Sequence, residues 1–135
     1  MDKLKSVLTK IFAWWHGATP GTMLYTRRHG VRVGADELGN EYFRGPVDSE
    51  GYERRWVIYP NANDPTTVPP GWHGWLHHRT DIPPSEEDYV APNWVKPHMP
   101  NMTGTALAYR PPGSLLNPER GRKSADEYDA WTPGG

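Results

Sequence analysis

The chain has no cysteine among its 135 residues. This absence excludes disulfide bonds, thiolate nucleophiles and cysteine-ligated zinc or iron–sulfur sites. A charge excess is also missing: 15 Lys and Arg against 16 Asp and Glu leave a formal net charge of −1, so no overall field attracts nucleic acid. No apolar run reaches the roughly 20 residues that span a bilayer. Residues 1–16 lack a long apolar stretch followed by a small-residue cleavage site, so we expect no signal peptide.

Aliphatic residues are scarce as well. Hydrophobic residues make up 36% of the chain, below the roughly 45–50% of ordinary globular proteins, and 14 Gly and 15 Pro add up to about a fifth of it. Yet there are seven Trp and seven Tyr, which disordered chains usually lack. Each aromatic side chain can bury about 150–250 Å² against another surface. We therefore expect a small folded patch with long adhesive arms, weakly stable and partly unfolded when isolated.

An amphipathic helix is predicted over residues 2–16. Its apolar side chains recur at helical spacing, and three lysines fall outside that stripe. The apolar positions are Leu4, Val7, Leu8, Ile11, Phe12 and Trp15. Because the rest of the chain offers little apolar surface, we favour docking in a partner's groove over contact with a membrane surface. Packing on the chain's own domain ranks third.

Residues 22–59 read as a small antiparallel meander. Alternation begins at 23–28 and resumes at 31–33, 42–44 and 55–59. Residues 36–40 and the two stretches 45–46 and 48–51 carry the turn-forming residues Gly, Asn, Asp and Pro. The predicted sheet has one dry face, which takes some of Val33, Tyr42, Trp56 and Ile58.

A short helix is expected to open at Pro69-Pro70, since proline suits a first helical turn. Trp72, Trp75 and Leu76 then share one apolar face. From residue 85 onward prolines recur too often for helices or central strands, and the scattered aromatics fit an extended arm lying in a groove. We predict a small α+β fold. It has an N-terminal amphipathic helix (1–20), a three- to four-stranded antiparallel meander plus one short helix (21–84), and a long irregular Pro-rich C-terminal arm (85–135).

Candidate chemical sites are few. His73 and His77 stand at i, i+4 with Asp81 nearby, a spacing that can bind zinc from one helical face. The glutamate of the metalloprotease motif is replaced by Gly74, so hydrogen bonding or helix capping by these histidines is the favoured interpretation. Acidic clusters at 36–37 and 86–88 fit solvated loops. The arginines at 27, 28 and 32 are either solvated or form salt bridges to an acidic partner; nucleic acid is a distant third.

Four segments resemble a known family. They are V-G-A-D-E-L-G-N-E-Y-F at 33–43, R-R-W-V-I-Y at 54–59, V-P-P-G-W-H-G-W-L-H-H at 68–78 with Asp81 and Pro83-Pro84, and the stretch 98–113. Together they resemble the 17-kDa-type accessory subunits of respiratory complex I, NADH:ubiquinone oxidoreductase, in their bacterial form. The W-H-x-W-L-H block is the most specific of the four.

The resemblance implies a non-catalytic subunit of the peripheral arm, without catalytic, cofactor-binding or metal-binding residues. Its partners would be the ferredoxin-like iron–sulfur subunit and neighbouring subunits of the quinone and NADH modules. It would be peripheral to the membrane, on the cytoplasmic side of a bacterial inner membrane or the equivalent matrix side, with possible membrane-surface contact through residues 2–16. Two alternatives stay open: a transient complex I assembly factor and a small zinc enzyme.

Combining the resemblance with the aromatic pattern, we expect thirteen residues to bind partners. These are Leu8, Phe12, Trp15, Trp56, Trp72, His73, Trp75, Leu76, His77, Trp94, His98, Asn101 and Tyr109.

Overall fold

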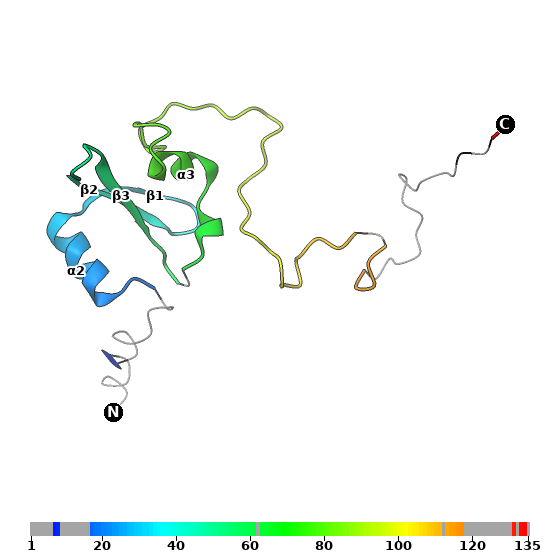
Figure 1. Cartoon of the computed structure of the whole chain (residues 1–135), viewed down its shortest axis with the longest axis horizontal. Coiled ribbons are helices and arrows are strands. Elements are labelled where there is room, and N and C mark those ends of the chain that lie inside the picture. Colours follow the sequence, from blue (N-terminus) through cyan, green and yellow to red (C-terminus); the bar gives the residue numbers. More distant parts are fainter. Residues whose placement is uncertain are drawn as a thin grey trace. The chain divides into compact units, whose positions relative to one another are not determined.

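The computed structural model describes residues 7–8, 17–61, 63–111, 113–117, 131 and 133–134. Two helices, three strands and a short 3₁₀ helix follow one another within it (Figure 1). They are α2 (Pro20–His29), β1 (Val31–Ala35), β2 (Glu41–Val47), β3 (Glu53–Ile58), η2 (Pro65–Thr67) and α3 (Pro70–Leu76). This confirms the small α+β class. The chain divides into two units, Met1–Asn101 and Met102–Gly135, and all of these elements belong to the first.

The helix predicted over 2–16 lies outside the described residues, apart from Val7 and Leu8, which are helical and exposed.

The sheet is an antiparallel meander in the order β1-β2-β3. Tyr42 of β2 faces Val57 of β3, and Phe43 faces Trp56. The predicted turn between β1 and β2 is confirmed: Gly39 has φ +86°, a conformation that glycine adopts without steric cost. Three strands form in the described part of the chain, the lower end of the expected three to four.

The strand expected at 23–28 is wrong, because this segment is the middle of helix α2. The Thr19 side chain accepts a hydrogen bond from the Thr22 amide, and Pro20 occupies the first helical turn. An N-cap threonine followed by proline is a helix-start signal. The short period-two pattern at 23–28 therefore gives the wrong prediction, and the helix-start signal at Thr19 and Pro20 is the correct one.

The Gly45-Pro46 pair was expected in a turn, but it lies inside β2. The pairing of β2 with β3 shifts register between Arg44 and Val47, and such an irregularity is where a strand tolerates proline. A Cβ atom on Gly45 would lie 2.8 Å from two atoms of the Trp56 ring. Glycine is therefore required here by the close approach of an indole.

Both faces of the sheet are covered, one by α2 and the other by α3 (Figure 1). On the α2 face, the Trp56 indole nitrogen donates a 3.0 Å hydrogen bond to the Thr26 hydroxyl, and the Tyr25 ring lies 5.6 Å from Trp56. On the α3 face, Tyr42 stacks on Trp72 at 3.9 Å between ring centroids. The expectation of a single dry face is thus corrected: Tyr42 and Trp56 are packed on opposite faces.

Candidate functional site

The W-H-x-W-L-H segment covers most of α3 and its C-cap residue His77, and its two tryptophans are part of the chain's own core. Trp75 is 1% exposed and Trp72 5% exposed, and they pack with Tyr42 and Val68. The two indoles meet edge to face, 5.7 Å between centroids, a favourable aromatic geometry. Since so little of either indole remains accessible, the expectation that Trp72 and Trp75 anchor a partner is corrected to a core role. Leu76 packs against the same cluster, and its side chain is half-buried.

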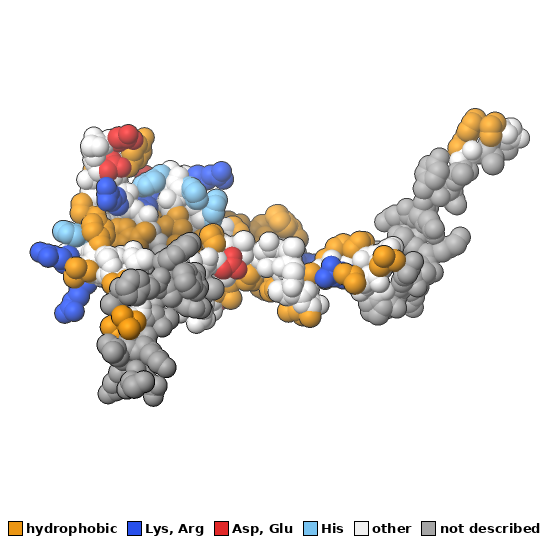
Figure 2. Space-filling model, turned by 60° about the horizontal axis from the view of Figure 1, so that its bottom comes forward, with side chains coloured by type: hydrophobic (Ala, Val, Ile, Leu, Met, Phe, Trp, Pro, Cys, Tyr) orange, Lys and Arg blue, Asp and Glu red, His pale blue; other side chains and the backbone are white. Residues whose placement is uncertain are grey.

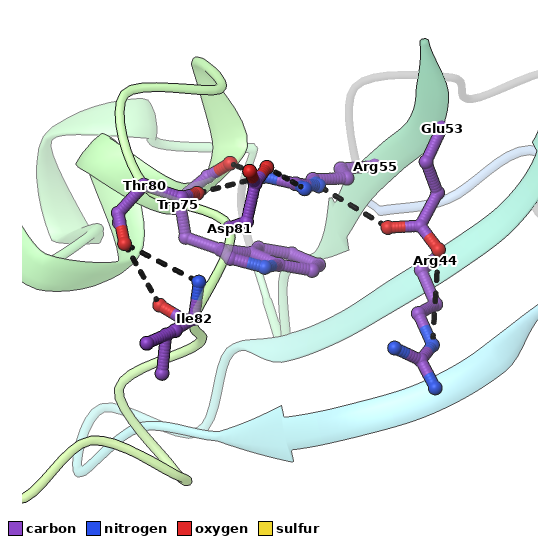
Figure 3. A network of polar contacts seen from close by, with 7 residues as sticks. All are labelled: Arg44, Glu53, Arg55, Trp75, Thr80, Asp81 and Ile82. Atoms are coloured by element: carbon purple, nitrogen blue, oxygen red, sulfur yellow. Dashed lines mark hydrogen bonds and ion pairs between the residues drawn. The ribbon is translucent and has the colours of Figure 1, made fainter. Parts of the chain in front are cut away.

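Arg55 fastens the end of α3 to the sheet (Figure 3). Its guanidinium donates to the main-chain oxygens of Trp75 and Thr80 at 2.8 and 2.9 Å, and lies 4.9 Å from the Trp75 ring centroid. It also pairs with Asp81 at 3.0 Å and with Glu53 at 3.3 Å. The Arg55 side chain is only 5% exposed. The sequence reasoning missed this residue, because an arginine in a strand is usually a solvated one.

A second network holds the β1–β2 turn to the segment before α3. The Asp36 carboxylate accepts hydrogen bonds from the Tyr42 hydroxyl at 2.7 Å and from the Asn40 amide side chain at 2.8 Å. Asn40 is 1% exposed, and its side chain also donates to the Thr67 hydroxyl at 3.1 Å. The sequence predicts Asp36 and Asn40 as turn residues and Tyr42 as a residue of the sheet face, but it does not predict the bonds that join them to Thr67. Together these residues make a half-buried, hydrogen-bonded link between distant parts of the chain.

The pKa of Tyr42 is raised far above its ordinary value, first by burial and then by its hydrogen bond to Asp36. Burial also raises the pKa of Tyr59. In the unfolded chain both phenols ionise near pH 10, while in the folded chain both ionise at higher pH. Their contribution to stability is therefore complete below pH 10 and is lost as the pH rises above it.

We expect the free energy of unfolding to fall between pH 10 and 11, by about 1 kcal/mol from Tyr42, whose pKa is raised the most. Tyr42→Phe should remove the Tyr42 share of this slope, at a cost of about 1 kcal/mol at pH 7 from the lost hydrogen bond. Urea titrations at successive pH values measure both. Equal slopes for the variant and the wild type would contradict the assignment.

The first part of the C-terminal arm is hydrogen bonded to the folded core at Thr66. His98 Nε2 donates to the Thr66 main-chain oxygen at 2.8 Å, and the main-chain amide of Asn101 donates to the Thr66 hydroxyl at 3.1 Å. Residues 95–99 also line a groove of about 960 Å³ with the β1–β2 turn and the start of α3. His98 and Asn101, both expected to bind partners, thus contact the chain itself while their side chains stay exposed.

Apolar side chains along the arm are exposed (Figure 2). Within the first unit Tyr89 is 67% exposed, Trp94 77% and Met99 68%. Within the second unit Leu107 and Tyr109 are exposed by 75% and 83%. Single exposed apolar side chains need no explanation, but a succession of them on a segment without a core is typical of an interaction surface.

His73 of α3 and the C-cap residue His77 are exposed, and their rings lie 4.2 Å apart. Among the described residues no group of three or more potential ligands is arranged to hold a metal ion. Asp81, the third ligand of the zinc hypothesis, pairs with Arg55 instead. Four further residues were predicted to bind partners. Trp56 is half-buried under α2 and Leu8 is 44% exposed, whereas Phe12 and Trp15 lie outside the described residues.

Within the described part of the chain no helix is both long and apolar enough to cross a membrane.

Residues 30–133 match the protein family "NADH ubiquinone oxidoreductase subunit NDUFA12". Among similar proteins is "NADH dehydrogenase [ubiquinone] 1 alpha subcomplex subunit 12" of Dictyostelium discoideum, 42% identical over 112 residues that cover 80% of each chain. A probable subunit of the same name from Arabidopsis thaliana is 34% identical and is covered over 75% of its length by 84% of this chain. An uncharacterized protein of Rickettsia prowazekii is 46% identical over 59 residues, 42% of this chain and 54% of that one.

Proposed function

Because the chain belongs to the family of NADH ubiquinone oxidoreductase subunit NDUFA12, we propose that it is a non-catalytic accessory subunit of respiratory complex I that holds neighbouring subunits together. The observation that carries this proposal is the contrast between a closed aromatic core and an arm whose apolar side chains stay exposed. The core forms from the chain's own aromatic residues, whereas Trp94, Met99 and Tyr109 are exposed and would gain burial against a partner.

The proposal extends to place and partners. We propose three working parts: a membrane-proximal N-terminal segment (1–20), a folded core (21–84) and a binding arm (85–135). The core would lie beside the quinone module against the ferredoxin-like iron–sulfur subunit, and the arm would run toward the NADH module. The protein would be peripheral, on the cytoplasmic or matrix side of the membrane. These finer statements rest on the motif resemblance, and the exposed arm supports them.

Proline supports the arm as a binding segment in physical terms. Residues 92, 97, 100 and 111 are prolines, each of which restricts the free chain and so lowers the entropy lost when the arm is ordered on a partner. The two bonds from His98 and Asn101 to Thr66 fix where the arm leaves the core. The contacts at Thr66 and the stiffness that the prolines give both favour binding of the arm in one defined path along the partner's surface.

We expect Trp94→Ala and, separately, Tyr109→Ala to weaken association with complex I by about 2 kcal/mol each, since buried aromatic anchors dominate interface energies. The measurement is binding of each tagged variant to membranes from a strain that lacks the gene, with bound partners identified by mass spectrometry. Glu87→Ala, an exposed arm residue, is the matched control. If both aromatic variants bound the membranes as well as the wild type, the proposal that the arm contacts complex I would be wrong.

Deletion of the gene tests the function itself. Native gels should show complex I that is lost or less stable, and NADH:quinone activity should fall with it. Normal assembly at every growth temperature would count against a structural role. Co-purification of the chain with the mature, active enzyme distinguishes a permanent subunit from the assembly-factor alternative, which predicts its presence only on intermediates. Stoichiometric zinc in the purified chain would revive the zinc enzyme.

A further inference from the structure

Helix α2 exposes a stripe of four side chains that the folded core does not use. Met23 and Leu24 are 53% and 59% exposed, and Arg27 and Arg28 are exposed one turn later. The i, i+4 spacing places Met23 beside Arg27 and Leu24 beside Arg28. We call these four residues the α2 stripe. The other side of the helix holds the sheet: Tyr25 contacts Trp56, and Thr26 is hydrogen bonded to it.

Among the described residues, no carboxylate pairs with the positive charges of the α2 stripe. The sequence of α2 contains no Asp or Glu, and three basic residues occupy its last turn. Elsewhere in the core, Arg32 pairs with Glu41 and Arg44 with Glu53. No ion pair within the described residues involves Arg27 or Arg28. Figure 2 shows cationic side chains projecting at the edge of the molecule on the side where α2 lies in Figure 1.

A helix C-terminus favours positive charge, which is a sufficient reason for basic residues in the last turn. It gives no reason for two large apolar side chains, more than half exposed, on the same stripe. Arginine and methionine are both enriched at protein interfaces, where charged rims surround apolar contacts. The combination therefore indicates a surface that is covered in the assembly.

We infer that the α2 stripe is a docking surface for a carboxylate-bearing segment of another complex I subunit. This inference rests on the proposed function. The guanidinium groups of Arg27 and Arg28 can each take a carboxylate in a bidentate pair, and Met23 and Leu24 would be covered by the apolar stem of the same segment. The flexible thioether of Met23 adapts to such a contact.

An anionic membrane surface fits these observations less well. Membrane-lying helices carry their cations on one face and bury a broad apolar face opposite to it. In α2 the opposite face is occupied by Trp56 and the sheet, and the cations share their stripe with the apolar residues. Two arginines would contribute only about 1 kcal/mol each at an anionic surface. A protein partner can desolvate the same two charges and pair each with a carboxylate.

The test is the full-length double variant Arg27→Gln/Arg28→Gln, added to membranes that contain complex I lacking this subunit. We expect its apparent Kd to rise at least tenfold at about 150 mM salt, and its salt dependence to be shallower than that of the wild type, since fewer ion pairs form. The matched control is Arg54→Gln/Arg79→Gln, which removes the same charge from two other exposed arginines. Far-UV circular dichroism verifies that both double variants are folded.

Unchanged Kd and salt dependence in the Arg27→Gln/Arg28→Gln variant would overturn the inference. An equal loss in the Arg54→Gln/Arg79→Gln control would also overturn it, because net charge rather than the stripe would then be responsible. Binding to phosphatidylglycerol vesicles is measured as an additional experiment. If the variant loses binding to vesicles but not to purified, detergent-solubilised complex I, the occupant is lipid and the inference is wrong. Failure of the wild-type chain to bind complex I at all would instead refute the proposed function.

Discussion

Replacing Trp75 by alanine is expected to lower the free energy of unfolding by about 3–5 kcal/mol, the usual cost of removing a large aromatic side chain from a core. Trp75 is 1% exposed and contacts both Trp72 and the Arg55 guanidinium. The core has few other members: among the described residues only Tyr42, Val68, Trp72 and Trp75 are buried hydrophobics. The side chains around this cluster are only half-buried, among them Val57, Tyr59 and Leu76, so collapse into the cavity would recover little of the lost packing. We expect the variant to be largely unfolded at 37 °C.

Urea unfolding followed by far-UV circular dichroism measures this effect, and Trp94→Ala is the matched control. Trp94 is 77% exposed on the arm, so its removal should change the free energy of unfolding by less than about 0.5 kcal/mol. Trp75→Phe keeps an aromatic ring in the cavity and should lose less than alanine. The two tryptophans thus separate stability from association: Trp75 is expected to act on the first and Trp94 on the second. Equal unfolding curves for Trp75→Ala and the wild type would contradict the assignment of Trp75 to a stabilising, buried core.

Arg55→Met is the second large effect, and we expect it to cost about 3 kcal/mol of unfolding free energy. Methionine keeps most of the apolar stem but removes the donors to the main-chain oxygens of Trp75 and Thr80. The Trp75 oxygen keeps a 3.1 Å hydrogen bond from the His78 main-chain amide, but the Thr80 oxygen loses the donor that Arg55 supplies. An acceptor shielded from water that loses its partner costs about 1–3 kcal/mol. The contact with the Trp75 ring is lost as well, worth about 0.5–2 kcal/mol where it is shielded from water.

Asp81→Asn is the control for Arg55→Met. The Asp81 side chain is 93% exposed, and an exposed ion pair contributes about 0–1 kcal/mol. We therefore expect its unfolding midpoint in urea to lie close to that of the wild type at both low and high salt. If Asp81→Asn proved as damaging as Arg55→Met, the ion pair rather than the two carbonyl contacts would be the essential part of this network.

The elements with strong local signals were predictable from the sequence. The turn at 36–40, the strand at 55–59 and the helix opening at Pro69-Pro70 depend on residues whose backbone preferences are narrow. The error at 23–28 has a local cause as well. Six residues of apparent alternation are too few to distinguish a strand from a short helix, and the cap made by Thr19 and Pro20 was the better evidence.

The candidate site was harder to predict, because a tryptophan pattern does not say which surface will cover it. Trp72 and Trp75 form the same i, i+3 pair whether they meet a partner or their own sheet. What decides the matter is the stacking of Tyr42 on Trp72, a contact between residues 30 positions apart. Arg55 and Asn40 escaped notice for the same reason, since their partners lie on segments distant in sequence.

The close fit of Trp56 over Gly45 has a consequence for how sequences of this kind can change. A methyl group at position 45 would collide with the indole, so a substitution there is harmful while Trp56 is present and becomes tolerable once a smaller ring has replaced it. The two positions are therefore expected to vary jointly or not at all. Such dependence of one mutation on another restricts the order in which a lineage can drift, and it makes the seam between α2 and the sheet slower to diverge than the exposed arm.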